Sequence, residues 1–373
     1  MSKRKFFTAL MLLTMVFVLL AGCQTAEEAP AAPAEEAEEA DEAVVEETEE
    51  EEAVEEAVEE PAELVDVSLR LNWQPQTEHA GFFVAMWNGY YEELGLNVTI
   101  EPAGPELQAV PQVAAGSDDF GLTEPHNVII GRSKGIPLVE VMQVQHDAYL
   151  RYVAKKANGI EKLEDVEGKI ASLWFGGGEY EFLAMLNSVG LSDQEVEVIA
   201  QRAGMAPFFE DEVDVASVTL FNELQQVYAE GYTDDDITIF SGKDFGVGLV
   251  ADGLFTTEKL IEEQPEVVQA FVTGSIRGWQ YAYENPEETA QMFVDNFPDL
   301  DYDKMLVMMN VINDLNTVGK GGEMGFGYMD KSYFETGKEV MELNDLLEGD
   351  VVLEDCYDLT FWENTPDEYK VTQ

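Results

Sequence analysis

The sequence has few residues of several kinds, and each shortage excludes a class of function. Only two of its 373 residues are cysteines and three are histidines, so a cysteine-rich metal site or a disulfide framework is excluded. Lysine and arginine number 20 against 76 aspartates and glutamates, which gives a formal net charge of −56. So acidic a surface repels the phosphates of nucleic acid. We therefore expect no nucleic-acid partner. We also expect no metal and no cofactor.

Long hydrophobic runs are scarce as well, and the one that stands out covers residues 6–21. Three basic residues precede it, and it ends in Leu20-Ala21-Gly22-Cys23. This pattern is typical of a secretory signal, and its cysteine resembles that of a bacterial lipobox. We predict that residues 1–22 are a signal peptide and that lipidated Cys23 anchors the protein to the outer face of the cell membrane. The alternative is a cleaved signal with an incidental cysteine.

Residues 24–66 contain 20 acidic residues and neither lysine nor arginine. Such a segment cannot bury enough apolar surface to offset its chain entropy, and its charges repel one another. We predict that Cys23 and the residues up to 66 form an acidic, disordered tether between the membrane and the folded body.

The body, residues 67–373, is too long for one compact core, so two lobes are expected. Its first part alternates strands and helices, which predicts an α/β fold with mainly parallel sheets flanked by helices. The expected strands are 67–71, 97–101, 119–123, 138–145 and 149–154, and the expected helices are 81–94 and 106–115.

A second unit of the same kind follows, and a strongly helical region ends the chain. We predict that residues 67–152 begin lobe 1, that 153–248 form lobe 2, and that 249–373 return to lobe 1. Chain crossings near 149–154 and 247–251 would form a hinge, and ligands bind beyond the strand ends of such sheets. The expected elements are strands 168–173, 196–201, 213–219 and 247–254, and helices 179–188, 221–230, 257–285, 286–297 and 302–315.

An ordered series of motifs in the body resembles the SsuA/ThiY-like binding proteins. This resemblance implies a type II periplasmic-binding fold and delivery of a ligand to an ABC permease and its ATPase. The Trp-x-Pro…His opening is most similar to the branch that binds pyrimidine precursors of thiamine, with the riboflavin-binding RibY type as a close relative. The motifs are Leu71–Pro75, His79–Ala85, Gly89–Tyr91, Gly95–Val98, Ala115–Gly121, Leu163–Lys169, Trp174–Tyr180 and Arg277–Ala282 followed by Asn285–Glu288.

Two tryptophans are the first candidates for ligand contact. Trp73 follows the first strand, and Trp174 has the same position in lobe 2, so their indoles would stack on a flat ring from two sides. Each stacked ring contributes about 1–3 kcal/mol. Burial of Trp73 in a core is an equally good interpretation.

Polar candidates lie at other strand ends and helix starts. The Gly-Gly-Gly turn at 176–178 would offer backbone N–H groups to an anion, or Glu179 simply complements the helix dipole there. His79 would donate to a ring nitrogen or carbonyl, or be a partly buried helix-start histidine. The predicted ligand contacts besides the tryptophans are His79, Glu124, Gln143, Tyr152, Gly177, Glu179, Tyr180, Asn222 and Asp244.

The acids among these positions, together with Glu223, favour a neutral or weakly cationic ligand, because carboxylates accept hydrogen bonds from amino and hydroxyl groups. We predict a binding protein for a heteroaromatic vitamin or precursor, either riboflavin or a thiamine-type aminopyrimidine. Alternatives are a sulfonate-type binder and a sensory binding protein. An enzyme is not expected, since the cysteine-rich iron motif of the related fungal thiamine-pyrimidine synthases is missing.

Overall fold

The computed structural model describes residues 63–104, 107–202 and 204–372. The predicted signal peptide, the lipidation site Cys23 and the tether up to residue 62 lie outside the described residues. The first strand begins at Val65, so the last residues assigned to the tether belong to the folded body. Within the described part of the chain, no helix is long and apolar enough to span a membrane.

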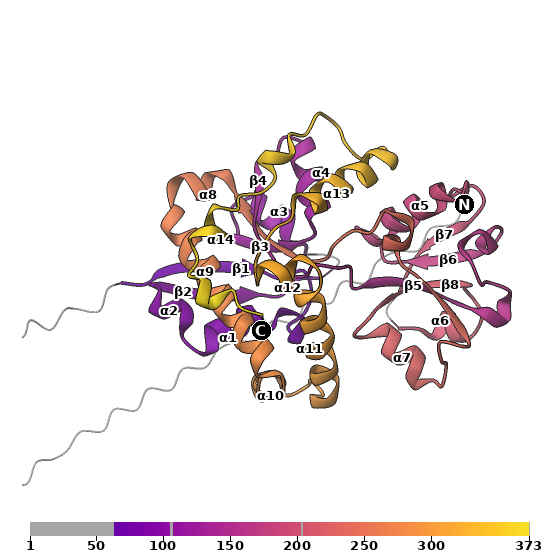
Figure 1. Ribbon diagram of the computed structural model, residues 1–373, viewed down its shortest axis with the longest axis horizontal. Helices are drawn as coiled ribbons and strands as arrows, with labels where there is room; N and C mark the ends of the chain where they lie inside the picture. The colour runs from indigo at the N-terminus through magenta and orange to yellow at the C-terminus, as the bar shows by residue number, and fades with distance from the viewer. Residues whose placement is uncertain (1–62, 105–106, 203, 373) are drawn as a thin grey trace, which may run out of the picture. The chain divides into compact units, whose positions relative to one another are not determined.

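The described strands form two five-stranded sheets (Figure 1). The first sheet has the order β2-β1-β3-β10-β4, in which β1 is parallel to β2 and β3. Strand β10 is antiparallel to both of its neighbours. These strands are β1 Val65–Arg70, β2 Leu96–Glu101, β3 Phe120–Thr123, β4 Leu138–Gln143 and β10 Gly253–Thr257.

The second sheet repeats this design in the order β7-β6-β8-β5-β9. Strand β6 is parallel to β7 and β8, and β5 is antiparallel to β8 and β9. In both sheets the antiparallel strand is therefore the one that the chain enters on crossing from the other sheet. The other four strands of each sheet run in one direction, so the predicted mainly parallel α/β architecture is confirmed. The strands are β5 Leu150–Lys155, β6 Ile170–Leu173, β7 Glu197–Ala200, β8 Val215–Thr219 and β9 Ile237–Phe240.

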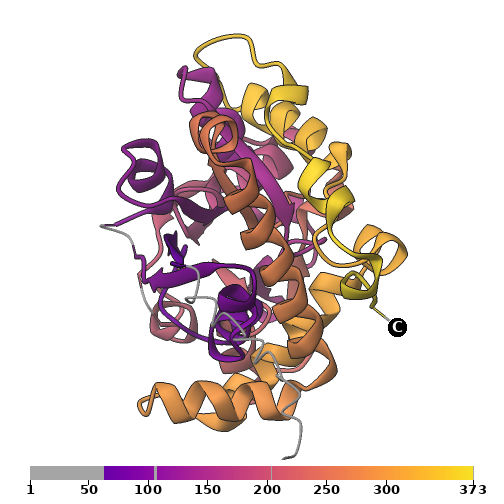
Figure 2. The same ribbon diagram turned by 90° about the vertical axis from the view of Figure 1, so that its left-hand side faces the viewer.

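Helices flank both sheets, and those of the C-terminal third, drawn orange to yellow, lie beside the indigo N-terminal elements (Figure 2). The α-helices are α1 Ala80–Trp87, α2 Tyr90–Glu93, α3 Ala109–Ala114, α4 Pro125–Ser133, α5 Gly178–Ser188, α6 Ala206–Phe209, α7 Glu223–Ala229, α8 Glu258–Glu263, α9 Pro265–Glu284, α10 Pro286–Asn296, α11 Tyr302–Thr317, α12 Lys320–Met324, α13 Lys331–Leu343 and α14 Thr360–Asn364. The short 3-10 helices are η1 Thr77–His79, η2 Lys156–Asn158, η3 Leu163–Val166, η4 Gly242–Phe245, η5 Leu353–Asp355 and η6 Asp367–Tyr369.

Helices α1 and α9 cross at two glycines. A Cβ added at Gly278 would lie 1.9 Å from the carbonyl oxygen of Gly81, so only glycine permits this approach. Around the crossing, the Phe271 ring stacks on Tyr91 and Phe120 with centroid distances of 5.0 and 4.2 Å. This buried aromatic cluster fixes the first sheet against the returning C-terminal helices and so provides a rigid base for the strand ends.

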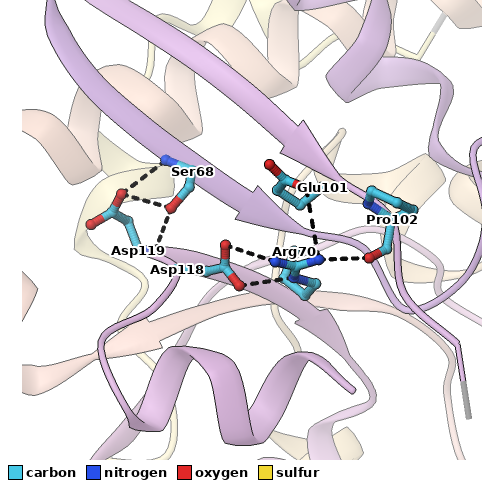
Figure 3. Close-up of polar contacts among 6 residues, drawn as sticks. All are labelled: Ser68, Arg70, Glu101, Pro102, Asp118 and Asp119. Carbon is cyan, nitrogen blue, oxygen red and sulfur yellow. Dashed lines mark hydrogen bonds and ion pairs between the residues drawn. The ribbon is translucent and has the colours of Figure 1, made fainter. Parts of the chain in front are cut away.

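The end of β1 is braced by an ion pair (Figure 3). The Arg70 guanidinium donates to Asp118 from Nε at 2.8 Å and from Nη2 at 3.3 Å, and its Nη1 donates to the carbonyl oxygen of Pro102 at 2.7 Å. Nearby, the Ser68 backbone N–H donates to the Asp119 carboxylate at 2.8 Å. The acidic pair before β3 thus locks β1 to its neighbours and holds the residues that follow β1 in place.

The chain crosses between the sheets at 144–149 and again at 241–252. The buried Gln143 side chain links the two crossings, because its Nε2 donates to the carbonyls of Gln145, Ala251 and Asp252 at 2.8–2.9 Å. Most expected strands and helices match observed ones within a few residues. The strand expected at 247–254 is wrong: this apolar segment is the second crossing, and β10 begins only at Gly253.

Candidate ligand-binding site

A cavity of about 510 Å³ lies where the strand ends of the two sheets face each other. We call the side formed by residues 72–126 the first wall and the side formed by residues 174–226 the second wall; both crossings close the cavity between them. Its volume is typical of a pocket that encloses one small organic ligand. The lining residues are Asn72, Trp73, Gln76, Glu78, Gly104, Gln108, Glu124, His126, Ala148–Leu150, Trp174–Gly178, Glu181, Gly204, Thr219, Phe221–Glu223, Gln226 and Leu249–Ala251.

Each wall contributes an indole from the end of a strand. Trp73 lies three residues after β1 and remains 41% exposed, so it is not a core residue. The Ala103 backbone N–H donates to its carbonyl oxygen at 3.0 Å, which fixes its position. Trp174 directly follows β6, and its backbone N–H donates to Ser217 Oγ at 3.3 Å. Two flat apolar surfaces are thereby presented to the same cavity.

The first wall holds its carboxylates through side-chain amides. Gln76 Nε2 donates to Glu78 Oε2 at 2.6 Å, and Asn127 Nδ2 donates to Glu124 Oε2 at 2.9 Å. The second crossing adds a further acid, Asp252. Its Oδ1 accepts from Asn72 Nδ2 at 2.7 Å, and its Oδ2 has no partner.

Burial and mutual repulsion raise the affinity of these acids for protons. Burial, with the Glu223 and Glu124 charges, raises the pKa of Glu78 to about 7, although the Gln76 hydrogen bond opposes the change. Burial and the charges of Glu78 and Glu124 raise the pKa of Asp252 well above its usual range. This cluster therefore favours a bound proton, a cation, or the N–H and O–H donors of a ligand.

Two histidines accompany the acids of the first wall. His79 is fully buried beneath the cavity, and its Nε2 pairs with Asn72 Oδ1 at 2.7 Å. His126, the second residue of α4, lines the cavity, and neither of its ring nitrogens has a partner. Burial lowers the pKa of both rings, to about 3 for His79. Each is therefore a neutral imidazole with one donor and one acceptor nitrogen.

The second wall holds its carboxylates through backbone N–H groups. Glu179 accepts from Gly176 N at 2.8 Å and from Gly177 N at 2.9 Å, so the glycine turn already has its anion. Glu223 accepts from the backbone N–H and the hydroxyl of Thr219 at 3.0 and 2.6 Å. Glu181 accepts from Leu249 N at 2.7 Å, and burial raises its pKa to about 7.

The structure brings together some of the predicted ligand contacts and separates others. Trp73, Glu124, Trp174, Gly177 and Asn222 line the cavity. The remaining predicted contacts lie outside its lining. They are His79 beneath the floor, Gln143 in the link between the crossings, Tyr152 with its hydroxyl bound to the Gly178 carbonyl, Glu179 on the glycine turn, Tyr180 against His126, and Asp244 on exposed η4.

Several lining residues were not predicted from the sequence. Glu78 and His126 are the most informative, because both are buried polar side chains that face a cavity. His126 lies three residues after the end of β3, which was an available signal, whereas Glu78 lies in η1, eight residues after the end of β1. Tyr149 and Glu181 gave no such signal, because the first lies in a crossing and the second lies inside a helix.

Comparison with curated proteins finds relatives that are named as binding proteins and as synthases. The chain is 25% identical over 304 residues to the riboflavin-binding protein RibY of Chloroflexus aurantiacus, covering 79% of this chain and 85% of the relative. It is 25% identical over 318 residues to the formylaminopyrimidine-binding protein of Halalkalibacterium halodurans, covering 79% and 90%. It is also 25% identical over 271 residues to the 4-amino-5-hydroxymethyl-2-methylpyrimidine phosphate synthase of Legionella pneumophila, covering 68% and 84%.

Solved structures share the fold at lower identity. The periplasmic sulfonate-binding protein SsuA of Methylobacillus flagellatus superposes with a TM-score of 0.64 at 17% identity, covering 83% of this chain and 96% of that one. The predicted periplasmic-binding fold is thereby confirmed. The family model described as NMT1/THI5 like matches residues 76–289, which include both walls of the cavity from Gln76 onward. The chain belongs to the NMT1/THI5-like family.

Proposed function

We propose that this chain is the extracytoplasmic solute-binding subunit of an ABC importer. Its ligand is a neutral or weakly cationic heteroaromatic, either riboflavin or a thiamine-type aminopyrimidine. The observation that carries this proposal is the composition of the cavity. Indoles from two sheets flank it, four glutamates line it, and no lysine or arginine is found among its described lining residues.

The two walls have complementary parts in recognition. Trp73 and Trp174 offer faces on which a heterocycle stacks, for about 1–3 kcal/mol per ring. A micromolar complex requires about 8 kcal/mol in total, so hydrogen bonds supply the remainder. Glu78 and Glu124 accept from amino or hydroxyl groups, and His126 provides one donor and one acceptor at the cavity surface.

An anionic ligand such as a sulfonate is disfavoured by the same geometry. In the glycine turn at 176–178, the backbone N–H groups of Gly176 and Gly177 already donate to Glu179. A sulfonate would also face the glutamates without a lysine or arginine among the described lining residues. Desolvating an anion beside fixed carboxylates is strongly unfavourable. The sulfonate alternative therefore needs a cationic contact, and the described lining offers neither lysine nor arginine for one.

A binding function is favoured over catalysis. The described lining contains neither cysteine nor serine to act as a nucleophile, and its threonine hydroxyl, that of Thr219, already donates to Glu223. The Gln143 link between the two crossings suits a hinge that closes the walls on a ligand. The predicted export signal, Cys23 anchor and acidic tether would hold such a clamp outside the cell, near a permease and ATPase. Co-purification with a receptor instead of a permease would favour the sensory alternative.

The test is a ligand survey with the purified full chain. A yellow, flavin-fluorescent preparation would identify riboflavin directly. A colourless preparation is titrated calorimetrically with riboflavin, thiamine, an aminopyrimidine and taurine. We expect micromolar or tighter binding of one heterocycle and no binding of taurine. Binding of taurine alone, or turnover of an aminopyrimidine precursor without added protein partners, would contradict the proposal.

A further inference from the structure

Beneath the first wall, three buried side chains converge on one point. Glu78 and His79 both come from η1, and Asp252 comes from the second crossing. One ligand-type atom of each lies within 4.8 Å of the others. Their side chains are 5%, 0% and 1% exposed. Asp252 is remote in sequence from the other two, so the grouping exists only in the folded chain.

The cluster contains acceptors without a matching donor. His79 Nε2 lies 2.7 Å from Asn72 Oδ1, so this nitrogen carries the proton and Nδ1 carries the lone pair. Neither His79 Nδ1 nor Asp252 Oδ2 has a hydrogen-bond partner. Both atoms are buried, and an unsatisfied buried acceptor costs about 1–3 kcal/mol. The buried acceptors of this cluster therefore outnumber its donors.

The surroundings orient the three groups as a metal site requires. A metal-ligating histidine commonly donates its other N–H to an oxygen that fixes its tautomer. Here Asn72 performs this task for His79 through Oδ1 and, through Nδ2, holds Asp252 at 2.7 Å. Gln76 does the same for Glu78 at 2.6 Å. Each candidate ligand is therefore positioned by a neutral amide.

We propose that Glu78, His79 and Asp252 form a binding site for a divalent transition-metal ion such as Zn²⁺. One imidazole nitrogen and two carboxylate oxygens are ligands that such ions accept at about 2.0–2.2 Å. Bound to one ion, these atoms would lie about 3–4 Å apart, so small side-chain rotations from the present spacing close the site. The sequence spacing of its histidines does not reveal this site, because the third ligand arrives from the second crossing.

The ion would have an open coordination position toward the cavity, because Glu78 lines it while His79 and Asp252 lie below. A ligand atom with a lone pair, such as a ring nitrogen or a carbonyl oxygen, fits that position. This inference concerns the protein alone and does not depend on the identity of the heterocycle.

The test measures Zn²⁺ binding to the full, heterocycle-free chain by equilibrium dialysis with elemental analysis. The buffer contains 0.5 M NaCl to screen weak binding by exposed carboxylates. We expect one tightly bound Zn²⁺ per chain. Asp252→Asn and Glu78→Gln each keep the shape of the side chain, and we expect each to weaken Zn²⁺ binding at least tenfold.

Two controls distinguish this site from adventitious binding. His126→Gln removes the other imidazole at the cavity, which is buried and has no hydrogen-bond partner, and Glu140→Gln removes a buried, unpartnered carboxyl of β4 outside the cluster. Both are expected to bind Zn²⁺ like the parent. Three results would overturn the proposal in favour of a proton shared among the three side chains. The first is that the parent has no tight Zn²⁺ site, and the second is that Asp252→Asn and Glu78→Gln bind Zn²⁺ as tightly as the parent. The third is that only His126→Gln loses Zn²⁺ binding. We also expect Zn²⁺ to raise the melting temperature of the parent but not of Glu78→Gln. This measurement decides the question even if Asp252→Asn fails to fold.

Discussion

The two walls of the cavity both carry acids, but they hold them differently. On the second wall, Glu179, Glu181 and Glu223 each accept from at least one backbone N–H group. On the first wall, Glu78 and Glu124 accept from the side-chain amides of Gln76 and Asn127. Backbone donors cannot leave without unfolding, whereas a side-chain amide can rotate and release its acceptor.

This difference separates structural acids from recognition acids. A carboxylate fixed by backbone N–H groups stabilises the local turn or helix start and has less capacity left for a ligand. A carboxylate held by a flexible amide can exchange that partner for the amino or hydroxyl group of a ligand. We therefore expect changes in the first wall to affect binding and changes in the second wall to affect stability, except at Trp174, whose indole we expect to affect binding.

The largest expected effect is the loss of both indoles. Trp73→Ala and Trp174→Ala should each weaken binding of the heterocycle by about 1–3 kcal/mol, and the double variant by about 2–6 kcal/mol if both rings contact the same ligand. Isothermal titration of the four proteins measures this directly. Leu343→Ala is the control, because Leu343 is 56% exposed and lies outside the cavity lining. Unchanged affinity in either single variant would remove that indole from the site.

A smaller effect should appear in the pH dependence of stability through Glu181. Burial raises its pKa from 4.5 to about 7, so the folded protein binds a proton that the unfolded chain has already released between these pH values. Stability therefore falls as pH rises through this window, by about 1.4 kcal/mol per pKa unit, or about 3 kcal/mol.

Urea unfolding at several pH values should show a loss that is smaller by about 3 kcal/mol in Glu181→Gln than in the parent, because the raised pKa values of Glu78 and Asp252 affect both proteins alike. Glu342→Gln, at an exposed surface position on α13, should behave like the parent. Parallel stability curves for the parent and Glu181→Gln would show that Glu181 is ionised in the fold like an ordinary surface acid.

The next effect compares one acid from each wall. Glu124→Ala should weaken binding of the heterocycle by about 2 kcal/mol, because a charge-assisted hydrogen bond is lost, with little change in the free energy of unfolding. Glu223→Ala should lower the free energy of unfolding by about 1–2 kcal/mol, because the backbone N–H of Thr219 loses its acceptor, and change affinity less than twofold. Calorimetry and urea unfolding measure both quantities; a reversed pattern would break the distinction between the walls.

Much of the fold could be predicted because local patterns agree with it. Strand β1 alternates apolar and polar residues, β3 and β6 are short and largely buried, and α9 has a clear amphipathic pattern. The apolar segment at 247–254 was misleading, because crossing the molecule buries Leu249 and Ala251 as effectively as a strand would. Helices α4 and α13 and the four-residue strand β9 were not predicted.

The candidate site was predictable where it depends on strand ends and not where it depends on the approach of distant segments. Trp73 and Trp174 follow strands, and both line the cavity. Asp252 joins the first wall only through the second crossing, and Tyr149 only through the first. His79 was expected to face the ligand, but η1 directs Glu78 to the cavity and buries His79 below it.

The central claim is that this cavity accepts a flat ring without negative charge. The most direct test compares two ligands built on the same ring, an aminopyrimidine with a hydroxymethyl group and the same ring with a sulfonatomethyl group. An unpaired anion near a fixed carboxylate costs about 4 kcal/mol at 4 Å with an effective dielectric constant of 20. We predict at least 100-fold tighter binding of the hydroxymethyl compound. Equal or tighter binding of the sulfonate would contradict the account.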